Sequence, residues 1–261
     1  MAARIVAVAN QKGGVGKTTT AISLGATLAA YERQTLLVDL DPQSNCSAGL
    51  GFRGDGIRPT SYDLILGGAT VETAAQPSEF PHLALVPATP DLAGAEVELV
   101  GMVGREFRLR DALAGDHTNP YDFVLVDCPP SLGLLTLNAL SAADGLLVPI
   151  QCEYFAMEGV SMLMSTVDEV RRFLNPGLTI DGILLTMYDE RTNLAQQVAD
   201  EVRGVFGDLV FETLVPRNVR LAEAPSFGRP IHAYDLRSRG SQAYLELGRE
   251  YLLRRENADD R

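Results

Sequence analysis

A glycine-rich loop near the N-terminus constrains the fold of this chain most strongly. The loop lies between a short apolar run at residues 4–9 and a predicted helix at residues 17–30. It consists of eight consecutive residues: Lys12, Gly13, Gly14, Val15, Gly16, Lys17, Thr18 and Thr19. Glycines let successive backbone N–H groups turn inward around an anion, and the N-terminus of a helix adds partial positive charge. A loop of this kind between a strand and a helix indicates a phosphate-binding site.

Strand and helix patterns alternate along the chain. Short apolar runs predict strands at 4–9, 35–39, 83–87, 123–127, 145–150, 180–186 and 210–213. Longer segments predict helices at 17–30, 61–66, 92–113, 132–143, 157–173, 193–206 and 242–254. This alternation is typical of a mostly parallel, twisted sheet with helices on both faces. We therefore expect one α/β domain of the P-loop NTPase kind over residues 1–255, followed by a disordered tail over 256–261.

The composition is that of a globular protein with one large core. Of 261 residues, 46% are hydrophobic and 21% are charged. No run reaches the roughly 20 apolar residues that span a bilayer, and no secretory signal precedes the first predicted strand. The three cysteines lack a C-x-x-C spacing, which argues against a disulfide framework or a zinc site. We expect a cytoplasmic protein.

Lysine is confined to the loop. Of the 22 lysines and arginines in the chain, only Lys12 and Lys17 are lysines. A compact ammonium fits beside phosphate oxygens where a broad guanidinium does not. We expect Lys17 to bridge the β- and γ-phosphates of a nucleotide and the Thr18 hydroxyl to bind Mg²⁺.

Acidic residues follow two of the predicted strands. Asp39 and Asp41 come at the end of strand 35–39, and Asp127 ends strand 123–127. In an open parallel sheet, ligands bind beyond the carboxyl ends of the strands, so these side chains should face the loop. A single aspartate at such a position is often a helix cap. Three of them on two strands favour a site that holds Mg²⁺ or orients an attacking water.

The loop departs from the pattern G-x-x-x-x-G-K-[ST], because Gln11 occupies the first glycine position and Lys12 is an extra lysine. It resembles the deviant Walker A motif, K-G-G-x-G-K-T-T, of the ParA/MinD family of ATPases. In that family two nucleotide-bound subunits pack face to face, and the first lysine reaches the ATP phosphates of the partner. The resemblance implies this trans role for Lys12, beside the catalytic roles of Lys17 and Asp41.

The same resemblance implies roles for the acids and for the base contacts. Asp41 lies in a segment similar to the D-x-D-P-Q motif of the family and would position the attacking water. Asp39 would help organise the metal site, and Asp127 matches the Walker B aspartate. The chain lacks the N-K-x-D signature of guanine binding. In the family, the loop that matches residues 215–218 packs against adenine, which implies ATP as the nucleotide and base contacts from Pro216 and Arg217.

Further segments look like chromosomal ParA, also called Soj, rather than MinD. They are 190–193, 216–226 and 234–240, and the similarity extends over nearly the whole chain. One departure is Ser44-Asn45-Cys46-Ser47, where Gly-Asn-Ala-Thr is more usual. The resemblance implies a DNA-segregation switch. ATP drives homodimerisation, the dimer binds double-stranded DNA without sequence preference, and a ParB/Spo0J-type centromere-binding protein stimulates hydrolysis. Such a protein would be associated with the nucleoid.

Charge distribution bears on the DNA contacts. The net charge is −12, yet residues 214–240 carry five arginines against two acids. The resemblance implies DNA contacts from Arg191 and Arg220, and the basic window supports Arg237 and Arg239 as neighbours. An acidic chain repels a polyanion, but a dimer would duplicate a modest basic patch and double its phosphate contacts, which would let such a chain bind DNA. The alternative interpretation of this window is a solvated face with ion pairs.

Two other functions fit the same loop. A MinD-like ATPase would act on membranes and would need a C-terminal amphipathic helix with a basic polar face; here the C-terminal segment has a mixed polar face and an acidic end. A P-loop metabolic ligase or reductase is the other alternative. A reductase would need paired cysteines to bridge a cluster, and Cys128 has no evident companion. Because the C-terminal segment lacks a basic polar face, we expect no membrane partner.

Overall fold

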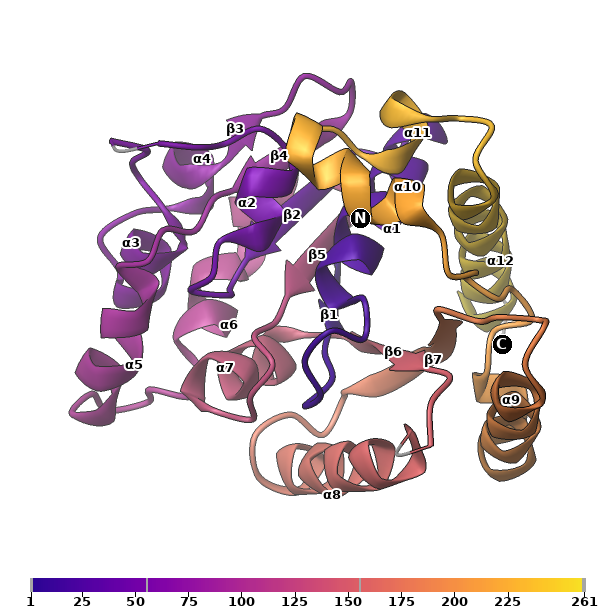
Figure 1. The fold of residues 1–261 in the computed structure, drawn as a ribbon. Coiled ribbons are helices and arrows are strands. Elements are labelled where there is room, and N and C mark those ends of the chain that lie inside the picture. Colours follow the sequence, from indigo (N-terminus) through magenta and orange to yellow (C-terminus); the bar gives the residue numbers. More distant parts are fainter. Residues whose placement is uncertain (1, 55, 155, 260–261) are drawn as a thin grey trace.

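The computed structural model describes residues 2–54, 56–154 and 156–259. They form one α/β domain around a seven-stranded sheet with strand order β3-β4-β2-β5-β1-β6-β7 (Figure 1). All neighbouring strands are parallel except β3 and β4, which are antiparallel. The strands are β1 (Arg4–Val8), β2 (Thr35–Asp39), β3 (Gln76–Pro77), β4 (Leu83–Val86), β5 (Phe123–Asp127), β6 (Gly145–Gln151) and β7 (Thr179–Thr186). The predicted fold class is confirmed.

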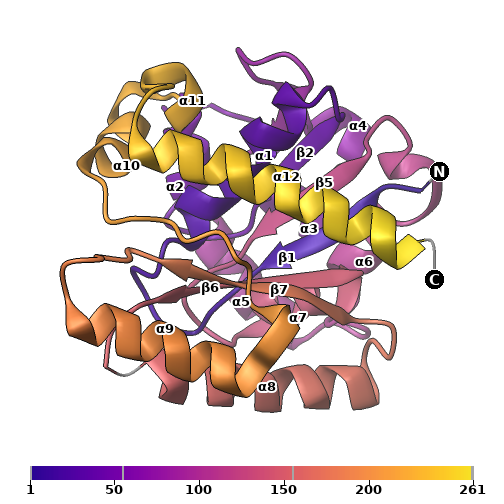
Figure 2. The ribbon, with the colours of Figure 1, turned by 90° about the vertical axis from the view of Figure 1, so that its right-hand side faces the viewer.

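Helices cover both faces of the sheet. In chain order they are α1 (Lys17–Ala30), α2 (Asn45–Gly49), α3 (Ser61–Leu66), α4 (Val71–Ala74), α5 (Leu92–Val100), α6 (Arg108–Leu113), α7 (Leu134–Ala142), α8 (Ala156–Phe173), α9 (Asn193–Phe206), α10 (Val219–Glu223), α11 (Ile231–Tyr234) and α12 (Arg239–Asp259). Three short 3-10 helices are η1 (Gly115–Thr118), η2 (Gly207–Leu209) and η3 (Ala224–Phe227). Figure 2 shows α12 crossing the face of the sheet that α1 also covers.

The core lies on both sides of the sheet because side chains alternate along each strand. In β1, Val6 belongs to the core under α1 and α12, whereas Ala7 belongs to the core under α3, α5, α7, α8 and α9. Strands β2 and β5 are buried along their whole length, as expected for central strands of a parallel sheet. The carboxyl ends of β1, β2 and β5 therefore reach the same edge of the sheet, where the glycine-rich loop begins.

Two predicted elements differ in the structure. The predicted helix 92–113 is broken into α5 and α6, because the intervening turn places Gly104 at a φ of 66°, in the left-handed region. The predicted strand 210–213 is wrong. Among its residues only Val210 forms a β-bridge, to Ile183. The backbone N–H groups of Glu212 and Thr213 donate to the Glu250 carboxylate on α12, at 2.9 and 3.0 Å, and so do not pair with a strand.

The C-terminal helix is longer than expected. Helix α12 continues to Asp259, so the predicted disordered tail is helical over residues 256–259. Residues 260 and 261 lie outside the described part of the chain. The helix is held to α1 by a hydrogen bond of 3.0 Å between the buried hydroxyls of Thr20 and Tyr244. This contact ties the last helix to the helix that follows the glycine-rich loop.

Candidate functional site

The glycine-rich loop adopts a conformation that requires its glycines. Gly14 and Gly16 have φ values of 75° and 91°, which side-chain-bearing residues rarely adopt. The loop is fixed to neighbouring strands: Asn10 Nδ2 donates to the Pro149 carbonyl at 2.7 Å, and Thr186 Oγ1 donates to the Val15 carbonyl at 2.8 Å. Helix α1 then begins at Lys17. The backbone is therefore set as an anion-binding turn at a helix N-terminus.

A cavity of about 500 Å³ opens above this loop. Its floor is formed by residues of the loop: Gly13, Gly14, Gly16, Lys17, Thr18 and Thr19. Its walls come from distant parts of the chain: Ile22, Asp41, Gln43, Asn45, Ala48, Arg53, Pro130, Met187, Pro225 and Ser226. Most of the predicted nucleotide-binding residues thus lie together on one cavity. Val15 is a buried residue of the loop and does not line the cavity.

The two lysines lie in different environments. Lys17 is only 6% exposed, and its Nζ donates to the Lys12 carbonyl at 3.1 Å. Burial lowers the pKa of Lys17, although the nearby Asp127 and Asp41 oppose this shift. Lys12 does not line the cavity; its half-exposed ammonium lies 3.4 Å from Glu153 Oε2, beyond the end of β6. One lysine therefore lies in the cavity, and the other lies outside it.

Asp39 and Asp127 are direct neighbours on the paired strands β2 and β5. Asp39 Oδ2 accepts hydrogen bonds from the backbone N–H and the hydroxyl of Ser47, at 2.8 and 2.6 Å. Burial nevertheless raises the pKa of Asp39 to about 6. Two carboxylates held side by side in the interior repel each other unless a proton or a cation lies between them.

Asp127 has no hydrogen-bond partner within the described residues, although both of its carboxylate oxygens are buried. Burial, and then the charge of Asp39, raise the pKa of Asp127 well above its ordinary value. The Thr18 hydroxyl approaches closely enough to oppose this shift without reaching hydrogen-bond geometry. A buried unpaired carboxylate is costly, and a divalent cation with a shell of water would satisfy it. The residues at this position therefore fit Mg²⁺.

Asp41 lies at the rim of the cavity, where it is 6% exposed. Its Oδ1 accepts a hydrogen bond of 2.9 Å from the Gln43 backbone, which fixes the turn that follows β2. Asp41 also lines the cavity above the loop. This placement suits a group that orients a water molecule beside a terminal phosphate.

Four exposed arginines were predicted to contact DNA: Arg191, Arg220, Arg237 and Arg239, here called the arginine face. Arg191 lies in the loop before α9, Arg220 on helix α10, Arg237 in the turn before α12 and Arg239 at its first residue. These segments lie at one end of the molecule in Figure 2. Arg239 Nη2 lies 3.1 Å from Glu190 Oε1, which joins the start of α12 to the loop before α9. The structure therefore brings three distant segments together at one end of the fold.

Comparisons with known proteins show the family to which the chain belongs. A family model described as an AAA domain matches residues 3–180. The chain is 58% identical to the chromosome partitioning protein ParA of Myxococcus xanthus, over 96% of this chain and 88% of that protein. It is 51% identical to the sporulation initiation inhibitor protein Soj of Bacillus subtilis, over 95% of this chain and 97% of that protein. The chain belongs to the ParA/Soj family of chromosome-partitioning proteins.

A solved structure also shares the fold of this ParA/Soj family member. It is cobyrinic acid a,c-diamide synthase from Mycobacterium smegmatis, determined with a bound ATP analog and magnesium. The TM-score is 0.82 at 39% identity, and the match covers 95% of this chain and 93% of that one. A P-loop fold with the same arrangement of strands therefore binds a nucleotide and magnesium in that protein.

Sequence reasoning missed part of the cavity wall. Met187, Pro225 and Ser226 line the cavity, whereas the predicted base contacts Pro216 and Arg217 are not among its described lining residues. Arg217 Nη2 instead lies 3.9 Å from Glu153 Oε1. Met187 has a φ of 51°, which is rare outside glycine, but no sequence pattern signals this. These walls come from loops whose proximity depends on the packing of the whole chain.

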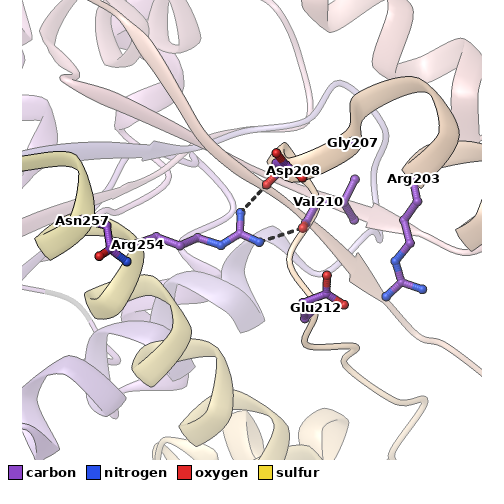
Figure 3. A pocket seen from close by; sticks show the side chains of 7 residues that line it. All are labelled: Arg203, Gly207, Asp208, Val210, Glu212, Arg254 and Asn257. Carbon is purple, nitrogen blue, oxygen red and sulfur yellow. Dashed lines mark hydrogen bonds between the residues drawn. The ribbon is translucent and has the colours of Figure 1, made fainter. Parts of the chain in front are cut away.

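A second hollow, of about 540 Å³, lies beyond the sheet edge between η2 and α12 (Figure 3). Arg254 dominates it, and its guanidinium donates to the carbonyls of Asp208 and Val210, each at 2.8 Å, and to Glu250 at 2.7 Å. These contacts use three of the five N–H donors of Arg254 and tie α12 to the segment that contains η2. None of the described helices is long and apolar enough to cross a membrane.

Proposed function

We propose that this protein is an ATP-dependent DNA-segregation switch that acts as a homodimer. The observation that carries the proposal is the unequal placement of the two loop lysines: Lys17 lies in the cavity, and Lys12 lies outside it on the exposed side of the loop. An ammonium outside its own site can neutralise the phosphates of a second copy. ATP would then bind two subunits together, since each triphosphate needs the lysine of the other.

The hydrolytic site would be completed by Mg²⁺. Thr18, Asp39 and Asp127 would hold the ion, directly or through its water shell, and it would neutralise charge on the β- and γ-phosphates. The backbone N–H groups of the glycines bind the phosphate oxygens, and Lys17 neutralises their charge. Asp41 would orient the attacking water and take up its proton. The buried, unpartnered carboxylate of Asp127 supports this assignment.

The ATP-bound dimer would bind double-stranded DNA through two copies of the arginine face. Phosphate contacts of this kind carry no sequence preference. A ParB/Spo0J-type protein bound to centromere-like sites would stimulate hydrolysis and release the subunits, and the protein would be cytoplasmic and associated with the nucleoid. The names of the curated relatives, chromosome partitioning protein ParA and Soj, support this role.

The test combines mass and DNA retention. Light scattering after size exclusion should give a monomer with ADP and a dimer with ATP and Mg²⁺. Only the ATP sample should be retained on random-sequence duplex DNA, with retention falling steeply between low and physiological salt. If the measured particle mass is the same with ADP and with ATP, the proposal is overturned.

A metabolic ligase is the second candidate, since the M. smegmatis protein carries a synthase name. The curated partitioning proteins are more similar, at 58% and 51% identity against 39%. An ATPase rate that rises with DNA and a ParB-type partner, and needs no small-molecule substrate, would exclude a ligase. Pelleting with liposomes in the presence of ATP would instead support a MinD-like activity.

A further inference from the structure

Carboxylates occupy most of the arginine face. Arg191 Nη2 lies 2.7 Å from Asp189 Oδ2, and its Nε donates to the other oxygen of the same carboxylate at 2.8 Å. This bidentate pair lowers the pKa of Asp189 to about 2. Arg239 pairs with Glu190 in the same loop. Of the arginine face, only Arg237 has no ion pair within the described residues.

Arg220 is held by two acids from different elements. Its Nη1 lies 2.8 Å from Glu223 Oε2, and its Nε lies 3.5 Å from Asp235 Oδ2. Glu223 is itself fixed, because the Tyr234 hydroxyl donates to its Oε2 at 3.0 Å. The Tyr234 ring stacks on Phe227 with 4.9 Å between ring centroids. The acid that neutralises Arg220 is therefore positioned by an aromatic scaffold and does not move freely.

These pairs are accessible to a competing anion. The Arg191, Arg220 and Arg239 side chains are 82%, 48% and 70% exposed. Exposed ion pairs are weak, so a phosphate that approaches from solvent can displace a carboxylate at small cost. A guanidinium that binds a carboxylate in two-point geometry can bind a phosphate in the same way.

We propose that Asp189, Glu190, Glu223 and Asp235 form an acidic latch, which neutralises the arginine face until DNA phosphates displace it. This inference rests on the proposed function, in which that face binds DNA. The latch weakens the binding of each subunit to DNA, so that retention requires the two faces of a dimer. It also speeds release, because the carboxylates recapture the arginines once the subunits separate.

The test measures DNA affinity and its salt dependence in the ATP-bound state. Glu223→Gln removes the nearer of the two charges that face Arg220 and should tighten binding to random duplex DNA about three- to tenfold, since one latch carboxylate is removed from each subunit of the dimer. It should also steepen the plot of log affinity against log salt by up to about two, one more net counterion per subunit. Tyr234→Phe frees Glu223 without changing any charge and should shift affinity in the same direction by less.

Glu72→Gln is the matched control. Glu72 is an exposed acid on α4, next to the edge strand β3 and without an ion pair among the described contacts. It changes the net charge by the same amount and should leave DNA affinity nearly unchanged. Dimer mass and basal ATPase rate should match the parent protein in all three variants, which excludes misfolding as the cause.

The outcomes separate the latch from the proposed function. If the parent protein shows no ATP-dependent DNA retention, the proposed function fails. If the parent binds DNA but Glu223→Gln binds with the affinity and slope of Glu72→Gln, the latch is refuted and the proposed function stands. Weaker binding by Glu223→Gln would also refute the latch, because Glu223 would then hold Arg220 in the orientation that DNA requires.

Discussion

At the residue scale, the two lysines of the loop lie in separate environments, and this difference supports the separate tasks proposed for them. Lys17 is buried beside Asp127 and Asp41, whereas Lys12 is half exposed and paired only with Glu153 in the described structure. The buried ammonium of Lys17 lies where the proposed function needs a charge for the phosphates of its own subunit. An exposed one can leave a weak surface ion pair at little cost.

Lys12→Ala should therefore abolish ATP-dependent dimerisation while leaving nucleotide binding to the monomer largely intact. The physical reason is that the second triphosphate loses the charge that neutralises it across the interface. Light scattering with ATP and Mg²⁺ measures the dimer, and fluorescent-nucleotide titration measures monomer binding. An unchanged dimer fraction would refute the trans role of Lys12.

Asp41→Ala should slow hydrolysis by a factor of about 10² to 10⁴, as expected for loss of a group that positions and deprotonates water. ATP binding and dimerisation should persist, so the variant should accumulate as a dimer on DNA. Single-turnover hydrolysis and DNA retention are the measurements. Normal turnover would show that another group orients the water.

The buried carboxylates Asp39 and Asp127 lower the folding stability of the nucleotide-free protein by an amount that depends on pH. Burial raises the pKa of Asp127 and raises that of Asp39 to about 6, so the folded state binds more protons than the unfolded state in this range. This contribution makes stability rise as the pH falls from about 8 towards 5. Asp127→Asn should stabilise the free protein at pH 8, by about 1–2 kcal/mol, and abolish Mg²⁺-dependent nucleotide binding.

Unfolding in urea between pH 5 and pH 8 checks this prediction. The advantage of Asp127→Asn should shrink as the pH falls, because Asp127 in the parent protein becomes protonated and its cost disappears. An advantage that is constant across this range would mean that packing, and not charge, causes the change.

At the element scale, short helices close the cavity. Helix η3 carries Pro225 and Ser226 into the wall, and Arg53 Nη2 donates to the Pro225 carbonyl at 2.7 Å. Gly228 ends η3 with a φ of 66°, and a Cβ there would lie 2.8 Å from the Gly51 Cα. The close approach of these two backbone segments therefore holds the wall in place.

Gly228→Ala should push η3 away from the segment that follows α2. We expect a loss of at least about 2 kcal/mol of folding stability, from left-handed strain and backbone overlap, together with weaker nucleotide affinity. Gly204→Ala on α9 is the control, since its Cβ would meet nothing within 4 Å. That change should stabilise the helix by about 0.5–1 kcal/mol. Thermal unfolding with and without nucleotide distinguishes the two; retention of full affinity by Gly228→Ala would contradict the role of η3.

At the scale of the whole molecule, net charge opposes both assembly and DNA binding. A chain with a net charge of −12 repels a second copy and repels a polyanion. The proposed switch overcomes this by neutralising triphosphates across the interface and by gathering arginines from three segments at one end of the fold. Both effects depend on the local position of charge and not on its sum.

Arg220→Ala should preserve the ATP-dependent dimer and reduce DNA retention. Loss of one phosphate contact per subunit should lower the slope of log affinity against log salt by about two per dimer. Measurement of retention across salt, beside dimer mass, checks this. Full retention with an unchanged slope would place the DNA contact elsewhere.

The strands, the loop and the acids could be predicted from sequence because their signals are local. Apolar runs such as 123–127 become buried strands wherever they lie, and glycines at Gly14 and Gly16 permit a turn that few other residues allow. The boundaries of β2, β5, α1, α3 and α9 follow from such patterns. The strand predicted at 210–213 is wrong because its side-chain pattern carries no information about Glu250. The Glu250 carboxylate accepts the backbone hydrogen bonds of this segment that a neighbouring strand would otherwise accept.

What the sequence determined by itself is the turn of the glycine-rich loop and most of the strands and helices, because these depend on residues a few positions apart. The tertiary structure decided which distant residues meet. It placed Met187, Pro225 and Ser226 around the cavity, joined Arg239 to Glu190, and set Asp39 beside Asp127. Contacts across such separations depend on how the helices pack on the sheet, and no short pattern along the chain encodes that packing.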